Sequence, residues 1–342
     1  MSGPYPYYGA NGVQDYVADY IFDDELVLLA EDGGNFGSKT RPIAYRVSGK
    51  CWVNNHAHVL KPMASMDVDY LCYSLMFYDT GELVNGATRQ KLTQTAMRKM
   101  LIPQRSLQEQ KRIVCELSKV QSIISARQQQ LQKLDELVKA RFVEMFGGIH
   151  NSNKYPYKPI KELTDVISGG TPNRDVNEYW ECGTIPWVKT TELQNNLIKK
   201  VDEYITEKGL NSSSAKLVPP GTVLIAMYGQ GKTRGMTAYL NIEACTNQAC
   251  ACILPSDQIN QTFLWKFLIL SYDDLRGMAK GGNQPNLNGT IIKNYPILYP
   301  PRELQEQFAA FVAQTDKSKV AVQKALDEAQ LLFDSLMQKY FG

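Results

Sequence analysis

The glycine-rich segment Gly229-Gln230-Gly231-Lys232-Thr233 is the clearest candidate for chemistry in this sequence, because it follows the apolar run Thr222–Ala226, which is predicted to be a buried strand. A nucleotide-binding phosphate loop would need glycine at position 226, where this chain has alanine, and the residues after Thr233 do not begin a helix. Small residues beside hydrogen-bond donors suit contact with a polyanion instead. An ordinary solvated turn is the alternative. The loop side chains that we predict to make such contacts are Gln230, Lys232, Thr233 and Arg234.

Cysteine and histidine do not form a catalytic or metal-binding pattern. Cys245, Cys250 and Cys252 cluster, and His56 and His58 lie two residues apart, but neither group has the spacing of four zinc ligands. Closely spaced thiols on a strand are expected to pack as small hydrophobes. The sequence has no Gly-x-Ser-x-Gly nucleophile motif, and three histidines leave little for general acid–base catalysis. We therefore expect a chain that catalyses nothing and holds no metal ion.

Amide and basic side chains recur at corresponding places in the two halves of the chain. Amides and arginines make paired hydrogen bonds with base edges, whereas lysine and threonine suit phosphate. The alternative is that each amide only completes a turn. The side chains that we predict to bind DNA are Lys39, Arg41, Asn54, Asn55, Arg89 and Lys91 in the first half, and Lys189, Thr190, Gln230, Lys232, Thr233, Arg234, Asn247, Gln284 and Asn286 in the second.

Two long helices are predicted to position these loops, over residues 105–147 and 302–342. Each has Leu-Gln-Glu-Gln near its start and Phe-Gly at its end; the first strings lie 197 residues apart and the second 195. Apolar residues recur every seven positions, which favours a helix that pairs with another, and each helix would be roughly 55–60 Å long. We predict that the two pair antiparallel; the alternative is two unrelated amphipathic helices. The predicted seam residues are Leu117, Ile124, Leu131, Val138, Phe308, Val312, Val322, Leu326 and Phe333.

The segments before the two helices repeat one pattern of strands and a short helix. Cys51–Leu60 is predicted to be one strand, Asp67–Tyr78 a short helix, and Phe263–Tyr272 its counterpart in the second half. The predicted fold class is α+β, with two α/β domains separated by two long antiparallel helices. The predicted parts are residues 1–104, 105–147, 148–301 and 302–342.

The first domain is shorter than the second by about 48 residues, and we expect it to lack a counterpart of roughly Ile149–Asn195. This span includes Gly169-Gly170-Thr171-Pro172 and Ile185-Pro186-Trp187-Val188. Either the natural N-terminus is absent, or another chain supplies the segment, or the first domain manages without it.

The composition is that of a globular protein without a membrane segment. Of the 342 residues, 44% are hydrophobic and 21% charged, and the net charge of +2 means that any basic surface must be local. The best apolar run, Phe263–Leu270, contains Lys266 and is too short to cross a bilayer, and no signal peptide is recognisable. Seven cysteines indicate free thiols in a reducing, cytoplasmic compartment.

The repeated motifs resemble those of the specificity subunit of type I restriction–modification systems. They are Pro-x-x-x-Leu-Gln-Glu-Gln at both helix starts, Phe-Gly at both helix ends, and the second domain's Gly169-Gly170-Thr171-Pro172, Ile185-Pro186-Trp187-Val188 and Tyr228–Thr233 segments, with Tyr7–Gly12 near the start. The resemblance implies two target-recognition domains that each read one half of a split sequence in double-stranded DNA. It also implies two modification subunits that bind S-adenosylmethionine and grip the helices, and restriction subunits with a motor and a nuclease.

Three other interpretations remain open from the sequence. The chain could be a dimeric coiled-coil scaffold without affinity for DNA. It could be an enzyme with a dispersed active site, such as a magnesium-dependent nuclease. It could also be a truncated or recombined specificity gene product with only one complete DNA-reading domain.

Overall fold

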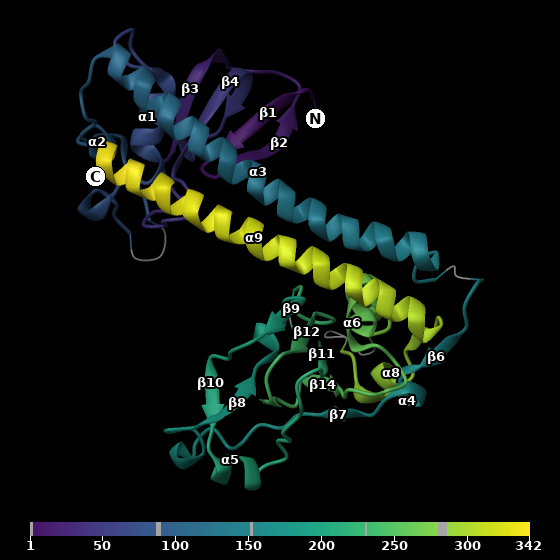
Figure 1. The fold of residues 1–342 in the computed structure, drawn as a ribbon. Coiled ribbons are helices and arrows are strands. Elements are labelled where there is room, and N and C mark those ends of the chain that lie inside the picture. The colour runs from purple at the N-terminus through teal and green to yellow at the C-terminus, as the bar shows by residue number, and fades with distance from the viewer. Residues whose placement is uncertain (1–2, 87–89, 151–152, 230, 280–285) are drawn as a thin grey trace. The chain divides into compact units, whose positions relative to one another are not determined.

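The computed structural model of the chain describes residues 3–86, 90–150, 153–229, 231–279 and 286–342 (Figure 1). The contacts divide it into two compact units, Met1–Gln130 with Val322–Gly342 and Leu131–Ala321, called here the first and the second unit. This division differs from the predicted four parts, because each long helix contributes one half to each unit.

The first unit is built on one five-stranded sheet with the order β2-β1-β4-β3-β5. The predicted short helix is present as α1 and packs on β3 and β4. Its elements are β1 (Tyr5–Gly9), β2 (Gly12–Val17), β3 (Phe22–Ala30), β4 (Ala44–Val53), β5 (Ala57–Leu60), α1 (Val68–Met76), η1 (Gly81–Leu83), α2 (Gln94–Met97) and the first part of α3 (Leu107–Phe146).

The predicted single strand Cys51–Leu60 is wrong, because the chain turns in the middle of it. β4 ends at Val53, and β5 begins at Ala57 and pairs antiparallel with β3. The Asn54 side chain accepts a hydrogen bond from the His56 backbone N–H (2.9 Å), a local closure that asparagine favours in turns.

The second unit contains a five-stranded sheet, β7-β14-β11-β12-β9, a three-stranded sheet, β10-β8-β13, and the pair β15-β6. Its elements are β6 (Tyr157–Pro159), α4 (Ile160–Leu163), β7 (Val166–Ser168), η2 (Asn177–Tyr179), β8 (Ile185–Val188), η3 (Thr190–Glu192), β9 (Asn196–Ile198), β10 (Glu203–Ile205), α5 (Glu207–Asn211), β11 (Val223–Ala226), β12 (Thr237–Leu240), β13 (Cys245–Thr246), β14 (Cys250–Ile253), α6 (Gln261–Leu270), α7 (Tyr272–Gly277), α8 (Gly289–Lys293), β15 (Pro296–Leu298) and the first part of α9 (Arg302–Phe341).

The two units share one strand arrangement. β3 pairs antiparallel with β4 and β5, as β11 does with β12 and β14. β1 pairs parallel with the end of β4, as β8 does with β13. The prediction that the first domain lacks a counterpart of Ile185–Val188 is therefore wrong, because β1 occupies that place. The described residues of the first unit do lack an equivalent of β7, as the sheet orders show.

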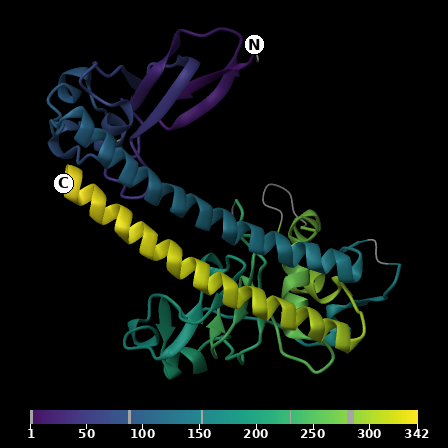
Figure 2. The same ribbon diagram turned by 45° about the horizontal axis from the view of Figure 1, so that its top comes forward.

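The long helices run antiparallel, and in each unit the start of one contacts the end of the other (Figures 1 and 2). In the first unit, Tyr340 near the end of α9 donates a hydrogen bond to Glu116 of α3 (2.5 Å). In the second, Phe142 of α3 packs edge-on against Phe308 of α9, with ring centroids 5.5 Å apart. Of the predicted seam residues, Leu131 and Leu326 are half-buried and the others are buried: Leu117, Ile124, Val138, Phe308, Val312, Val322 and Phe333.

The two helices correspond at a spacing of 195 residues, although the Leu-Gln-Glu-Gln strings lie 197 apart. α3 begins at Leu107 and α9 at Arg302, and each is 40 residues long. Gln110 and Gln305 are both 1% exposed. Each accepts a hydrogen bond from the backbone N–H of the residue that caps the neighbouring helix: Asp67 before α1 (2.7 Å) and Asn260 before α6 (2.9 Å). The structural equivalents are thus the fourth letter of one string and the second letter of the other.

Candidate nucleic-acid interface

Four loops of the second unit meet where strands β7, β8, β11 and β13 end. We call this surface the second rim; it comprises residues 169–173, 189–192, 227–235 without 230, and 247–249, together with Asn286, whose neighbour Leu287 bonds to the carbonyl of Met227. Gly169 has room only for hydrogen, because a Cβ there would overlap the carbonyl oxygen of Thr246. Backbone hydrogen bonds close the rim: Asn247 N–H to Val188 O (3.1 Å), Gly170 N–H to Thr246 O (2.8 Å) and Met227 N–H to Ala249 O (2.8 Å).

The first unit has a matching first rim, formed by residues 9–11, 31–35, 54–56 and 91. It is closed by equivalent backbone hydrogen bonds. Because these bonds join main-chain groups, they do not depend on the identity of the side chains. Asn54 N–H to Tyr8 O (2.9 Å) matches Asn247 to Val188, Glu31 N–H to His56 O (2.9 Å) matches Met227 to Ala249, and Leu92 N–H to Glu31 O (2.7 Å) matches Leu287 to Met227 (3.0 Å).

The glycine-rich loop of the second rim is fastened to α7 through its backbone. Arg276 donates to the carbonyls of Gly231 (2.9 Å) and Arg234 (2.8 Å), and the Tyr272 hydroxyl donates to the carbonyl of Lys232 (2.6 Å). The Lys232 side chain is exposed, so it can meet a phosphate while its backbone is held. Thr233 and Arg234 are half-buried in the same loop.

Other predicted contacts of the second rim are partly engaged within the protein. Lys189 forms an ion pair with Glu203 (2.8 Å), and this hydrogen bond raises the pKa of Lys189. Thr190 is half-buried at the start of η3. Asn247 holds a buried side-chain oxygen without a hydrogen-bond partner among the described residues, and Asn286 is half-buried.

The predicted residues of the first unit fall into two groups. Lys39 and Arg41 are exposed in the loop between β3 and β4, and Asn55 is exposed in the turn that Asn54 closes. Lys91 instead forms an ion pair with Glu31 (3.0 Å). Arg89, Gln230 and Gln284, also predicted, lie outside the described residues.

Two groups of residues at or beside the rims were not among the predicted DNA-binding residues. In the first rim, His56 Nδ1 lies 2.8 Å from Asp32, and on the adjoining strand β5 His58 Nδ1 lies 3.7 Å from Glu31. The spacing of two residues between the histidines could have indicated this cluster, although His56 lies in the turn before β5.

In the second unit, Arg174 lies over the ring of Trp180, 3.7 Å from its centroid, and forms an ion pair with Glu203 (2.7 Å). Burial alone would raise the pKa of Glu203, but hydrogen bonds from Lys189 and Arg174 hold it below its usual value. Arg174 follows the Gly169–Pro172 motif by two residues, and that position was the available signal.

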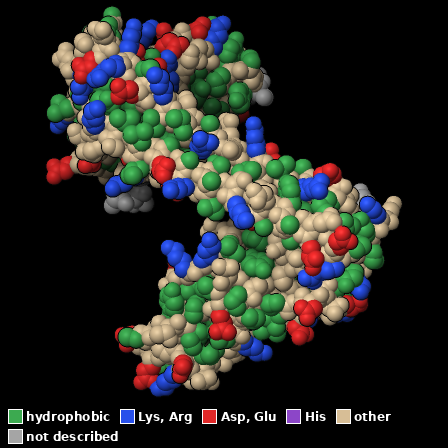
Figure 3. All heavy atoms as spheres, in the orientation of Figure 1, with side chains coloured by type: hydrophobic (Ala, Val, Ile, Leu, Met, Phe, Trp, Pro, Cys, Tyr) green, Lys and Arg blue, Asp and Glu red, His purple; other side chains and the backbone are tan. Residues whose placement is uncertain are grey.

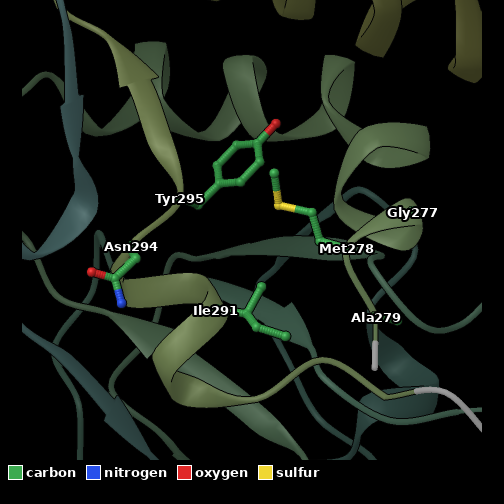
Figure 4. Close-up of a pocket in the computed structure, with 6 residues that line it drawn as sticks. All are labelled: Gly277, Met278, Ala279, Ile291, Asn294 and Tyr295. Carbon is green, nitrogen blue, oxygen red and sulfur yellow. The ribbon is translucent and has the colours of Figure 1, made fainter. Parts of the chain in front are cut away.

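Charges of both signs are interspersed over the face seen in Figure 3. A hollow of about 410 Å³ lies between α7 and α8, where Met278, Ile291 and Tyr295 surround a shared space (Figure 4). Among the described residues, no predicted DNA-binding residue lines it. Among the described residues, no three His, Cys, Asp or Glu side chains gather as a metal site, and no helix is long and apolar enough to span a membrane.

The repeated domain, the helix pair and the two rims define a class of proteins with duplicated recognition modules. A family profile described as "Type I restriction modification DNA specificity domain" matches residues 1–136 and again residues 153–329. The chain therefore belongs to the family of DNA specificity subunits of type I restriction–modification systems. The predicted family and the predicted fold class are confirmed.

Individual relatives are similar over most of the chain. A putative type I restriction enzyme specificity subunit of Haemophilus influenzae is 28% identical over 359 residues, covering 99% of this chain and 86% of that protein. The MjaVIII specificity subunit of Methanocaldococcus jannaschii is 23% identical over 369 residues, covering 95% and 84%.

Solved structures show the same fold. The S subunit of a type I system from M. genitalium superposes with a TM-score of 0.56 at 16% identity, covering 99% of this chain and 89% of that one. A chain from a structure titled "Structural basis underlying complex assembly and conformational transition of the type I R-M system" gives 0.58 at 18% identity, covering 99% and 92%.

Proposed function

We propose that this chain is the non-catalytic DNA-reading subunit of a type I complex, in which each rim contacts one half of a bipartite target in double-stranded DNA. The observation that carries the proposal is the duplicated frame of backbone hydrogen bonds, which presents amide and basic side chains at the same strand ends in both units. Such side chains suit base edges and phosphates.

The helix pair is the proposed docking element for the other subunits. Two modification subunits, which bind S-adenosylmethionine, grip α3 and α9, and restriction subunits join them for cleavage. The helices thereby set the separation of the two half-sites. This chain needs no cofactor in this scheme.

The role of the glycine-rich loop is tested by Lys232→Ala in the assembled methyltransferase. Lys232 is exposed on a loop whose backbone is fixed by Arg276 and Tyr272, so its loss removes one phosphate contact without unfolding the loop. The dependence of log K on log salt should become shallower by about 0.9. Binding is measured by fluorescence anisotropy at salt concentrations from about 50 to about 200 mM.

The matched control is Lys161→Ala, which removes an exposed lysine of α4, outside the rim. Its salt slope should equal that of the unmodified complex. Equal slopes for all three proteins would exclude the loop from the interface.

Two further experiments test the proposed function as a whole. Methylation mapping should give a bipartite motif. Magnesium-dependent cleavage of DNA by the isolated chain would contradict the non-catalytic assignment.

A further inference from the structure

We propose that the free edge of β5 in the first unit receives an extended segment of another polypeptide as a sixth, antiparallel strand. The segment that binds is expected to be a short strand with two successive apolar β-branched residues followed by a small residue. This inference concerns protein recognition and does not rest on the proposed DNA contacts.

The second unit supplies the template for this edge. β14 lies between β11 and β7, whereas β5 is the last strand of its sheet, with β3 on one side and no strand of the described residues on the other. The pairing of β5 with β3 has the same register as that of β14 with β11, so His58, Val59 and Leu60 correspond to Ala251, Cys252 and Ile253.

The backbone of β7 is bound to β14 through the groups that β14 turns away from β11. Cys252 lies opposite Ile167, and the pairing is flanked by hydrogen bonds from Leu254 N–H to Asp165 O (3.0 Å) and from Gly169 N–H to Cys250 O (3.4 Å). Antiparallel hydrogen bonds alternate in direction. The bond from Glu31 N–H to His56 O therefore places the N–H and C=O of Val59 on the free side of β5.

β5 is less buried than β14, as expected for a strand that lacks a neighbour on one side. Ala251, Cys252 and Ile253 are at most 1% exposed, whereas the equivalent His58, Val59 and Leu60 are all half-buried. Val59 and Leu60 border the two separate apolar clusters on opposite faces of the sheet. An added strand would cover apolar surface on both faces.

The chemistry of β7 indicates what this edge accepts. Val166 is 6% exposed in the cluster on one face of its sheet, and Ile167 packs against the cluster on the other, while Ser168 is exposed. A second copy of this chain could not offer this strand, because its own β7 is already paired with β14. β5 is also short and is followed by Lys61, which pairs with Asp24 (2.6 Å), features that disfavour unspecific pairing of edges.

The proposal is tested by adding a labelled synthetic peptide with the sequence of residues 156–171 to the full chain. We expect saturable 1:1 binding by fluorescence anisotropy, with slower hydrogen exchange at residues 57–61. A peptide N-methylated at the residue corresponding to Ile167 lacks the central donor and should bind at least about tenfold more weakly, a loss of about 1.4 kcal/mol. Val59→Pro should weaken binding similarly, because proline removes the outward N–H and is tolerated on edge strands.

Three results would overturn the proposal. The first is no saturable binding at millimolar peptide. The second is protection at Cys250–Ile253, which would mean that the peptide displaces β7. The third is self-association of the chain that protects Val59 without peptide, which would make a second copy the occupant. The N-methylated peptide keeps the test valid even where Val59→Pro fails to fold.

Discussion

The two rims have the same backbone frame but different side-chain chemistry. The first carries the ion pair of Glu31 with Lys91, and His56 beside Asp32; the residues of the second unit equivalent to Glu31, His56 and Lys91 are Met227, Ala249 and Asn286. The frame tolerates this exchange because main-chain groups supply its hydrogen bonds. Two copies of one architecture can therefore present different surfaces to DNA, which is what reading two unlike half-sites requires.

A similar contrast occurs where a domain helix meets a long helix. In the first unit, the Tyr73 hydroxyl of α1 donates to Gln121 of α3 (2.7 Å). The equivalent residues of the second unit are Lys266 of α6 and Asp316 of α9, counted from the same helix caps and starts. Lys266 is only 9% exposed, so a charge occupies a place that the first unit fills with a neutral pair.

The largest difference between the units is expected at the two phenylalanines that end the long helices. Phe146 is 1% exposed and contacts four aromatic rings, so Phe146→Ala should lower the free energy of unfolding by about 3–5 kcal/mol. Phe341 is half-buried with one ring neighbour, Tyr70, so Phe341→Ala should cost below about 2 kcal/mol.

Urea unfolding followed by tryptophan fluorescence measures both changes, since the second unit contains Trp180, Trp187 and Trp265 and the first Trp52. The control is Val143→Ala, at a position 48% exposed on the same helix, with an effect within about 0.5 kcal/mol. Equal losses for the two phenylalanines would contradict the unequal packing of the helix ends.

The register of the two helices is tested by four glutamine variants. Gln110→Ala and Gln305→Ala should each cost about 1–3 kcal/mol, because each leaves a helix-cap N–H buried without its acceptor. Gln108→Ala and Gln307→Ala change exposed residues and should stay within about 0.5 kcal/mol. Matched losses at Gln108 and Gln305, the same letter of each string, would favour the 197-residue alignment instead. Thermal unfolding at one pH suffices for all four.

The smallest effects on stability are expected for substitutions of Lys266 in the second unit and of Tyr73 at the equivalent place in the first. Burial lowers the pKa of Lys266, an effect that Asp316 and Asp135 partly oppose and Lys319 adds to. The folded state then binds fewer protons than the unfolded state, so this lysine destabilises the fold at neutral pH, and stability rises as the pH approaches the ordinary value of 10.5. Lys266→Met should therefore raise the melting temperature at pH 7, with a gain that shrinks toward pH 10.

Tyr73→Phe is the matched variant in the first unit. It should lower stability by about 0.5–1.5 kcal/mol through the lost hydrogen bond to Gln121. Burial raises the pKa of Tyr73 to about 12, so its hydroxyl stays protonated and the loss should not change between pH 7 and about pH 9. A gain from Lys266→Met that is independent of pH would show that the apolar packing of methionine, and not the removal of the charge, is responsible.

The sequence alone determined the elements that depend on neighbouring residues. Seven-residue periodicity and the Phe-Gly ends predicted both long helices to within a few residues, and the apolar run Thr222–Ala226 predicted β11. The family also followed from these local motifs. Such features are written in consecutive side chains, so they survive without knowledge of distant partners.

Only the tertiary structure decided how the repeats correspond and which rim side chains are already engaged. Identical Leu-Gln-Glu-Gln strings suggested one register, yet burial of Gln110 and Gln305 fixed another. The match of β1 to β8 rests on their backbone pairing with β4 and β13, because Pro6 and Pro186 are the only identical residues at equivalent positions of these two strands. Likewise, the ion pairs of Lys91 and Lys189 join residues far apart in the chain. Contacts of this kind depend on where the backbone brings side chains together, and not on their order in the sequence.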